Sequence, residues 1–144
     1  MEELHTTISA MLRDAGQRYT RSRRAVVDVL AESRRPLTLP EILDIEPALA
    51  QSSAYRNLAE LVDAGVVRRI ITSDEHSHFE LEEHLTGEHH HHLICGDCGT
   101  VTDFVVPPEL EQLIDRASIA VGRQQQFQVD HHRFDLLGRC AACG

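Results

Sequence analysis

The amino-acid sequence predicts an α+β fold in two parts: a helical N-terminal half that ends in a β-hairpin, and a C-terminal half of short strands around one helix. Apolar residues recur at helical spacing as far as Gly65, and at the spacing of short strands after it. All four cysteines and nine of the ten histidines also follow Gly65. A chain of 144 residues is long enough for one ordinary domain or two very small ones.

The composition is that of a folded protein with an aliphatic core. Hydrophobic residues make up 42% of the chain and aromatic residues 4%, which excludes wholesale disorder. No apolar run approaches the roughly 18 residues that a membrane span needs, and no apolar segment of a secretory signal follows Met1. We therefore expect a cytoplasmic protein with no membrane partner. The net charge of −9 lies mostly in the C-terminal half, so the N-terminal half can still bind phosphate.

Four amphipathic helices are expected before the change of spacing. Thr38 and Glu41 form a capping box, which predicts the start of the third helix. Hydroxyl residues before apolar stripes predict other helix starts, at Thr20 or Ser22 for the second helix and at Ser52 or Ser53 for the fourth. The expected helices lie within residues 4–16, 20–33, 38–47 and 52–65.

Short strands are expected after the helices. Residues 66–71 and 78–81 form a hairpin around a turn at 73–75, so helices followed by a two-stranded wing give the outline of a winged helix-turn-helix. In the C-terminal half, strands at 92–95 and 101–106, a helix introduced by Pro107 and Pro108, and a last strand at 129–137 are expected. The predicted division is a winged-helix domain at 1–82, a hinge at 83–90 and a second domain at 91–144.

The four cysteines form two C-x-x-C pairs: Cys95, Cys98, Cys140 and Cys143. Without an export signal, such pairs favour a metal over disulfides. Four thiolates give Zn²⁺ a closed tetrahedral shell, which is typical of a structural site. Two redox dithiols, or buried cysteines with no ligand, are the alternatives.

Four consecutive histidines occupy residues 89–92. Alternate side chains of a strand point to opposite faces, so His89 and His91 would serve one site and His90 and His92 another. Imidazole binds zinc, iron, nickel and copper, and carboxylates would complete the two shells. A solvated, polar strand end is the alternative. The candidate partners are Glu80, His84, Asp103, Glu111, His131 and His132.

The fourth helix carries hydrogen-bonding side chains in its first turns. A recognition helix places such N-terminal residues against the edges of DNA bases and against phosphates. An ordinary amphipathic helix with a solvated face is the alternative. The candidate contacts are Ser52, Ser53, Tyr55 and Arg56, with a basic cluster of Arg18, Arg21, Arg23 and Arg24 before the second helix.

Together these residues resemble the ferric uptake regulator family of metal-dependent repressors, over nearly the whole chain. The order and spacing of the histidine and cysteine motifs are the most specific part of the likeness. The matching segments are G-Q-R-Y-T-R-S-R, S-S-A-Y-R-N-L-A-E-L-V-D-A-G, F-E-L, H-H-H-H-L-I-C-G-D-C-G and H-H-R-F-D-L-L-G-R-C-A-A-C.

The resemblance implies a winged-helix DNA-binding domain, a hinge and an α/β dimerisation domain, in a homodimer that binds a palindromic operator when a regulatory metal is present. It assigns base and phosphate contacts to Tyr55 and Arg56 and a minor-groove contact to Arg18. The four cysteines match the structural zinc site. A site within the dimerisation domain matches His89, His91, Glu111 and His132. The hinge-side regulatory site matches His90 and His92, with Glu80 or His84 and with Asp103.

Two departures from the family pattern bear on the regulatory metal. Iron- and peroxide-sensing relatives usually add a histidine after the second helix, where this chain has Arg34, Arg35 and Pro36. Zinc-sensing relatives usually have a cysteine before the histidine run, where this chain has His84. The missing histidine, together with the segment T-G-E-H-H-H-H, favours zinc, whereas the segment D-H-H-R-F-D and Asp103 favour the peroxide- or iron-sensing branch. We expect Zn²⁺ first and Fe²⁺ second, with manganese, nickel or peroxide sensing as alternatives within the family.

Two other classes of function fit the sequence less well than a repressor does. A zinc hydrolase or deaminase needs an open metal position beside a general base, and the sequence contains neither H-E-x-x-H nor the deaminase motif. A metal buffer that does not bind DNA would not need Tyr55 and Arg56 at the start of a helix. The sequence therefore predicts a regulator and not an enzyme.

Overall fold

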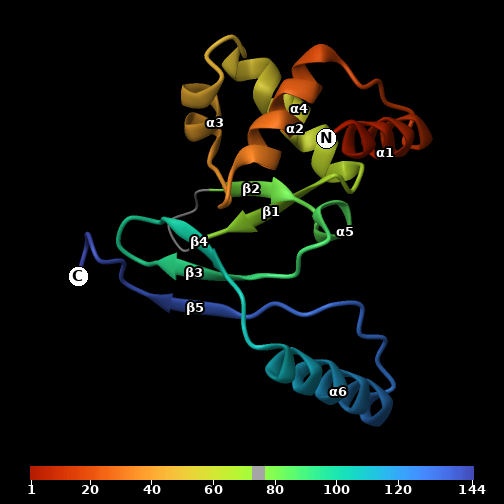
Figure 1. Ribbon diagram of the computed structural model, residues 1–144, viewed down its shortest axis with the longest axis vertical. Helices are drawn as coiled ribbons and strands as arrows, with labels where there is room; N and C mark the ends of the chain where they lie inside the picture. Colours follow the sequence, from red (N-terminus) through yellow and green to blue (C-terminus); the bar gives the residue numbers. More distant parts are fainter. Residues whose placement is uncertain (73–76) are drawn as a thin grey trace.

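A computed structural model describes residues 1–72 and 77–144, so the turn expected at 73–75 lies outside the described residues. Figure 1 shows the helical part at one end, a β-hairpin beneath it, and a three-stranded sheet with one long helix at the other end. In the described part of the chain, no helix has the length and apolar character needed to cross a membrane.

The N-terminal part contains α1 (Glu2–Asp14), α2 (Arg21–Glu32), α3 (Leu39–Ile45) and α4 (Gln51–Asp63). Their apolar stripes meet in one core, which includes the fully buried Ile8, Leu12 and Ile42. The capping box of Thr38 and Glu41 is confirmed, and Thr20, rather than Ser22, caps α2.

The expected start of α4 is wrong by one to two residues. The helix begins at Gln51 with Ala50 as its N-cap, and no side chain caps it. Ser53 Oγ instead donates a hydrogen bond to the Ala50 carbonyl at 3.2 Å. The first turn therefore leaves its backbone N–H groups without a serine cap.

The wing consists of β1 (Val67–Ile71) and β2 (Ser77–Leu81), which pair antiparallel with Arg68 opposite Glu80. Leu37 extends this sheet by pairing with Phe79. The expected hinge contains a short helix that the sequence did not predict, α5 (Glu83–Thr86). Gly87 ends it with φ of 74°, a conformation that glycine adopts without strain.

The C-terminal sheet has the order β4-β3-β5, with β3 (His91–Cys95) in the centre, β4 (Val101–Phe104) antiparallel to it and β5 (Asp135–Gly138) parallel to it. Helix α6 (Pro108–Gln125) connects β4 to the segment before β5.

The strand expected at 129–137 is wrong over its first six residues, because only Asp135–Gly138 form β5. The preceding segment turns back along α6: Gln126 is left-handed, with φ of 52°, and the Phe127 N–H donates to the Gly122 carbonyl at 2.8 Å. A Cβ at Gly122 would lie 2.7 Å from the Phe127 carbonyl oxygen, so this close return depends on glycine. The segment is used to return from the helix to the sheet and has no strand partner until residue 135.

Candidate metal centres and nucleic-acid interface

Potential metal ligands gather in three clusters in the described part of the chain. Within each cluster, one ligand atom from every residue lies within 4.8 Å of the others. Strand β3 and the two residues before it contribute to all three. The clusters are the sulfur cluster (Cys95, Cys98, Cys140, Cys143), the α6 cluster (His89, His91, Glu111, His132) and the hinge cluster (Glu80, His90, His92, Asp103).

The sulfur cluster forms because β3 and β5 run parallel. Their C-terminal ends lie side by side, and the Gly96 N–H donates to the Gly138 carbonyl at 2.8 Å, which brings the two C-x-x-C turns together. Sγ of Cys98 lies 3.7 Å from Sγ of Cys140. All four cysteines are free thiols.

The thiols of the sulfur cluster differ in acidity. Backbone N–H groups of Cys98 and Cys140 lower the pKa of Cys95 to about 6. Contacts with the thiols of Cys140 and Cys98 raise the pKa of Cys143 to about 12. The cluster on its own therefore resists full ionisation, whereas a divalent cation would stabilise four thiolates. This donor set fits zinc.

The α6 cluster joins the histidine run to the first turn of α6. Glu111 is its centre: its Oε2 lies 3.1 Å from His89 Nε2 and 3.5 Å from His132 Nε2, and its Oε1 contacts His91 Nε2. Burial would raise the pKa of Glu111, but the His91 hydrogen bond and the nearby histidines hold it below its usual range.

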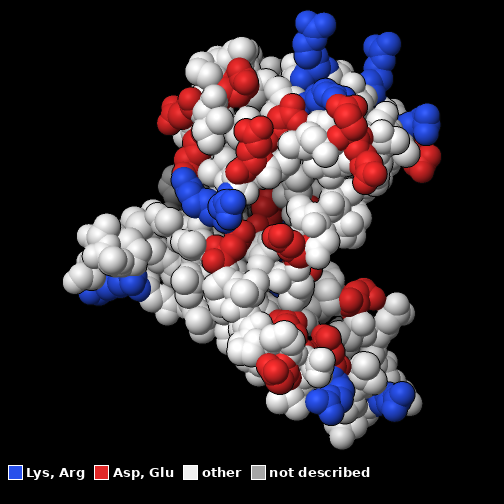
Figure 2. Space-filling view, viewed as in Figure 1, with Lys and Arg blue, Asp and Glu red and all other residues white. Residues whose placement is uncertain are grey.

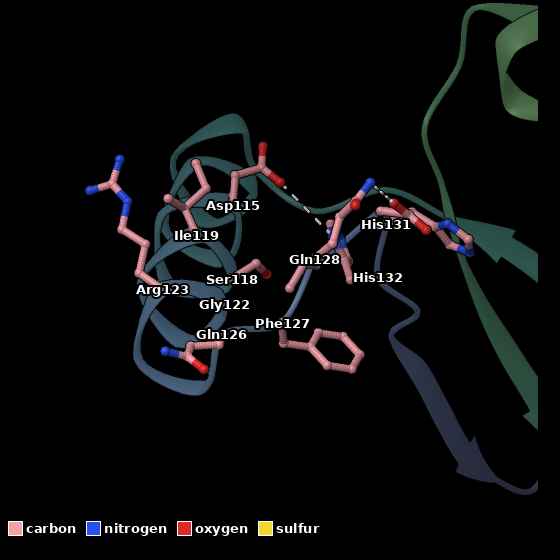
Figure 3. A pocket seen from close by; sticks show the side chains of 12 residues that line it. Asp115, Ser118, Ile119, Gly122, Arg123, Gln126, Phe127, Gln128, His131 and His132 are labelled. Atoms are coloured by element: carbon pink, nitrogen blue, oxygen red, sulfur yellow. Dashed lines mark hydrogen bonds and ion pairs between the residues drawn. The ribbon is translucent and has the colours of Figure 1, made fainter.

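His132 also borders a cavity of about 720 Å³ between the second half of α6 and residues 126–132. Figure 3 shows Asp115 on the helix turned toward His132, whose Nδ1 lies 3.9 Å from Asp115 Oδ1. At this distance the contact is a long ion pair and not a hydrogen bond. Ile119 and Phe127 on the cavity wall are exposed to solvent.

The hinge cluster combines residues from both parts of the molecule. Glu80 lies on β2 of the wing, whereas His92 lies on β3, His90 directly before it and Asp103 on β4. The two oxygens of Glu80 lie 2.9 Å from His90 Nε2 and 2.9 Å from His92 Nε2. Asp103 lies 3.5 Å from each of the same nitrogens.

The charges of the hinge cluster favour a cation. Burial would raise the pKa of Glu80, but hydrogen bonds from His90, His92 and Arg68 hold it well below its usual range. Burial and the charge of Glu80 raise the pKa of Asp103 to about 6. Among the described residues, the buried Oδ1 of Asp103 has no hydrogen-bond partner. A divalent ion would supply that partner and offset both carboxylates, so the residues fit a metal.

Two histidine partners considered from the sequence lie elsewhere. His84 is exposed on α5 and His131 is exposed after α6, and neither belongs to a ligand cluster among residues 1–72 and 77–144. Glu80, and not His84, therefore lies beside His90, His92 and Asp103. Arg34 and Arg35 line a cavity of about 720 Å³ that is also lined by Glu80, His90 and Asp103. The guanidinium of Arg35 pairs with Glu41.

Sequence reasoning missed two residues beside these clusters. Arg68 pairs with Glu80, and Glu83 contacts both Arg68 and His89. The hairpin register places Arg68 opposite Glu80 and could have revealed the first contact. Glu83 lies on the short helix that was not expected, so its position gave no such signal.

The proposed DNA contacts lie on the free surface of α4 and before α2. Tyr55 is 59% exposed, and Ser52, Arg56 and Arg18 are also exposed, with Ser53 half-buried. In Figure 2, arginine side chains project from the helical end, which also carries acidic side chains.

The basic cluster was expected before the second helix, but Arg21, Arg23 and Arg24 lie in the first turn of α2, which begins at Arg21. The cluster is only partly available to DNA. The guanidinium of Arg23 donates to Asn57 Oδ1 at 3.2 Å and to the Arg18 carbonyl at 2.6 Å, and it pairs with Glu60. Arg24 pairs with Glu2 at 3.0 Å. Arg23 therefore holds α2 against α4 and supports the backbone of Arg18.

Comparison with known proteins agrees with this architecture. Residues 14–137 match the ferric uptake regulator family. Peroxide-responsive repressors of Staphylococcus epidermidis and Staphylococcus aureus are each 33% identical over 98% of this chain, which covers 90% and 91% of their lengths.

Solved structures give the same result. The ferric uptake regulator of Helicobacter pylori, described with three functional metal-binding sites, superposes with a TM-score of 0.74 at 25% identity, over 99% of this chain and 92% of its own. The ferric uptake regulator of Vibrio cholerae superposes with a TM-score of 0.70 at 29% identity, over 90% of this chain and 96% of its own.

The fold and its clusters thus define a metal-responsive DNA-binding repressor with an N-terminal DNA-binding domain and a C-terminal dimerisation domain. The chain belongs to the ferric uptake regulator family. Members of this family act as dimers, bind operator DNA and are transcriptional regulators rather than enzymes.

Proposed function

We propose that the hinge cluster is the regulatory metal site, and that its occupation sets the affinity of a homodimer for a palindromic operator. The observation that carries this proposal is the origin of the ligands. Glu80 belongs to the wing of the N-terminal domain (1–82), whereas His92 and Asp103 belong to the C-terminal domain (91–144), beyond the hinge (83–90).

Ligands from two domains restrain the position of one domain relative to the other. Two recognition helices of a dimer must lie about one helical turn of DNA apart to contact both half-sites. Glu80, anchored by Arg68, would fix the wing against β3 and so fix this separation. Metal and operator would then each increase the affinity for the other, because their coupling is reciprocal. The metal itself supplies a divalent charge that favours the ionised forms of Glu80 and Asp103.

The donor set of the hinge cluster supports Fe²⁺ as the regulatory ion. Two imidazoles and two carboxylates, without a thiolate, suit a harder ion than the sulfur cluster does. Zn²⁺, which the sequence pattern favoured, is the competing assignment. A peroxide-responsive repressor is a second candidate function, since the two staphylococcal relatives carry that name.

The other two clusters complete the proposal. The sulfur cluster would hold structural Zn²⁺, and the α6 cluster a second divalent ion within the dimerisation domain. The description of three functional metal sites in the Helicobacter pylori relative supports three sites here. Exposed apolar side chains such as Ile119, Phe127 and Leu137 in this domain suit burial against a second copy.

The DNA contacts follow from α4. We propose that Tyr55 reads bases and Arg56 holds phosphate, with Ser52 and Ser53 beside them and Arg18 reaching the minor groove. Such a regulator acts on the chromosome, so we propose a cytoplasmic location.

Metal analysis combined with operator binding tests the proposal. The protein is purified, its metals are measured, and operator affinity is determined after anaerobic addition of Fe²⁺, Mn²⁺ or Zn²⁺. His90→Ala should remove the difference between metal-free and metal-loaded affinity in a folded dimer, because an effector acts only through differential affinity for two conformations. His89→Ala should retain part of the response.

The opposite pattern would reverse the assignment of the two sites. A response in His90→Ala equal to that of the unaltered protein, with loss in His89→Ala, would make the α6 cluster regulatory. If operator affinity responds to Zn²⁺ alone, Zn²⁺ and not Fe²⁺ is the regulatory ion. Loss of operator binding after peroxide treatment of the Fe²⁺ form would support the second candidate function.

A further inference from the structure

Arg68 lies between the hinge cluster and the α6 cluster without belonging to either. Its Nε donates to Glu80 Oε1 at 3.1 Å, and its Nη2 pairs with the same oxygen. On its other side, Nη1 lies 3.6 Å from Glu83 Oε1. The side chain is only 21% exposed, so water screens these contacts incompletely. One guanidinium is therefore shared by a carboxylate of the hinge cluster and a carboxylate of α5.

Glu83 continues this contact toward the α6 cluster. Its second oxygen, Oε2, lies 2.8 Å from Nδ1 of His89. The other ring nitrogen of His89, Nε2, points into the α6 cluster, 3.1 Å from Glu111 Oε2. The path from one cluster to the other is thus Glu80, Arg68, Glu83 and His89. Neither Arg68 nor Glu83 belongs to the ligand sets.

We propose that Arg68 and Glu83 couple the two metal sites, so that an ion at one weakens binding at the other. This inference rests on the proposed function, in which both clusters bind metal. A carboxylate that accepts a hydrogen bond from one imidazole nitrogen orients the ring and strengthens the other nitrogen as a ligand. Glu83 orients His89 in this way. A stronger ion pair between Arg68 and Glu83 weakens the hydrogen bond that Glu83 accepts from His89.

The direction of the coupling follows from the shared guanidinium. An ion at the hinge cluster would neutralise part of the charge of Glu80 and so weaken its ion pair with Arg68. Arg68 would then interact more strongly with Glu83. Glu83 then becomes a poorer acceptor for His89, and the α6 cluster binds its ion less tightly. Reciprocity requires the same factor in the reverse direction.

A metal titration of three related proteins measures this coupling. Each protein keeps zinc in the sulfur cluster and is titrated with Mn²⁺, a redox-stable ion that accepts nitrogen and oxygen ligands. A His92→Ala background blocks the hinge cluster and a His91→Ala background blocks the α6 cluster, which gives the intrinsic affinity of each remaining site. The coupling factor is the ratio of this intrinsic affinity to the affinity for the second ion when both sites are intact.

We expect a coupling factor of about 10 in the unaltered protein and a fall to about 2 in Glu83→Gln, in which only direct repulsion between the ions remains. Glu88→Gln removes the same charge from the same segment outside the ligand clusters of the described residues, and should leave the factor unchanged. Arg68→Lys should also lower the factor, because a single ammonium cannot hold both carboxylates as a guanidinium does.

The outcomes separate this inference from the function on which it rests. If Glu83→Gln keeps both sites and has the same coupling factor as the unaltered protein, the proposed role of Arg68 and Glu83 is wrong, and the proposed function is unaffected. Absence of Mn²⁺ binding at the hinge cluster would overturn both the proposed regulatory site and the coupling through Arg68 and Glu83.

A measurement without metal adds a second test. In metal-free protein, nitrogen NMR of His89 should show a hydrogen-bonded Nδ1 proton that Glu83→Gln weakens and Glu88→Gln preserves. An unchanged His89 signal in Glu83→Gln would contradict the contact on which the coupling depends.

Discussion

Glu41 links the start of α3 to the loop before it. Its Oε1 accepts hydrogen bonds from the Thr38 N–H and the Thr38 hydroxyl, each at 3.0 Å, and its Oε2 pairs with Arg35. Burial would raise the pKa of Glu41, but the Arg35 and Thr38 contacts hold it below 4.5. Folding therefore favours the ionised carboxylate at this position.

The sign of the pH dependence follows directly. Because the folded pKa of Glu41 is lowered, its contribution is fully present above the unfolded pKa of about 4.5 and is lost as pH falls through the folded value. Glu41→Gln should destabilise the helical domain by about 0.5 kcal/mol at pH 7, because the charged contact with Arg35 is lost while glutamine can still complete the capping box. Urea unfolding at pH 7 and at about pH 3.5 should show this difference shrinking with acid. A difference that grew at low pH would contradict the assignment.

Sequence patterns pointed to the residues of the three ligand clusters but not to every contact around them. Strand alternation predicted two separate pairs of histidines, and the structure places His89 and His91 in the α6 cluster and His90 and His92 in the hinge cluster. The role of Arg23 was different from the prediction, because its charge suggested DNA while its contacts join α2 to α4. A run of arginines does not reveal which of its members will find a partner far away in the sequence.

Helix α4 is the element most directly open to test in the DNA-binding domain. Its exposed face carries Tyr55 and Arg56, and its opposite face buries Leu58 and Leu61. Substitutions on the exposed face should therefore change DNA binding without changing the stability of the core.

We expect the two exposed residues to differ in effect. Arg56→Ala should weaken binding to operator and to random DNA alike and lower the salt dependence by about one phosphate contact, whereas Tyr55→Phe should mainly relax sequence preference. Titrations at several salt concentrations, on both kinds of DNA, measure this. An unchanged affinity and salt slope for Arg56→Ala would remove α4 from the DNA interface.

Elements with strong local signals were predictable, and elements defined by distant contacts were not. The capping box at Thr38 predicted the start of α3, and apolar segments on either side of a polar turn predicted the hairpin of β1 and β2. The short α5 has only four residues and no side-chain cap, so its sequence reads as a polar linker. The start of β5 depends on pairing with β3, which no local pattern from residue 129 onward specifies.

At the scale of the molecule, the sulfur cluster joins the end of the chain to the central strand. Cys140 should be essential to this link, because structural zinc contributes its binding free energy directly to folding. Cys140→Ser should lose zinc, lower the melting temperature of the C-terminal domain and dissociate the dimer. Metal analysis, calorimetry and sedimentation measure these effects, and chelator-treated protein should behave similarly. A stable, zinc-containing dimer of Cys140→Ser would contradict the structural assignment.

The four histidines at 89–92 do not by themselves determine the register of β3 in its sheet. A slip of one residue turns every side chain of a strand to the opposite face, yet in residues 89–92 such a slip would still present imidazoles on both faces. The alignment must be set by the residues that follow. Ile94 is 7% exposed and Leu93 is 42% exposed, so a slip would bring the buried isoleucine into water and move Cys95 away from the other sulfurs. The position of Cys95 in the sulfur cluster is thus tied to the register that decides which histidine faces which site, as far as six residues away.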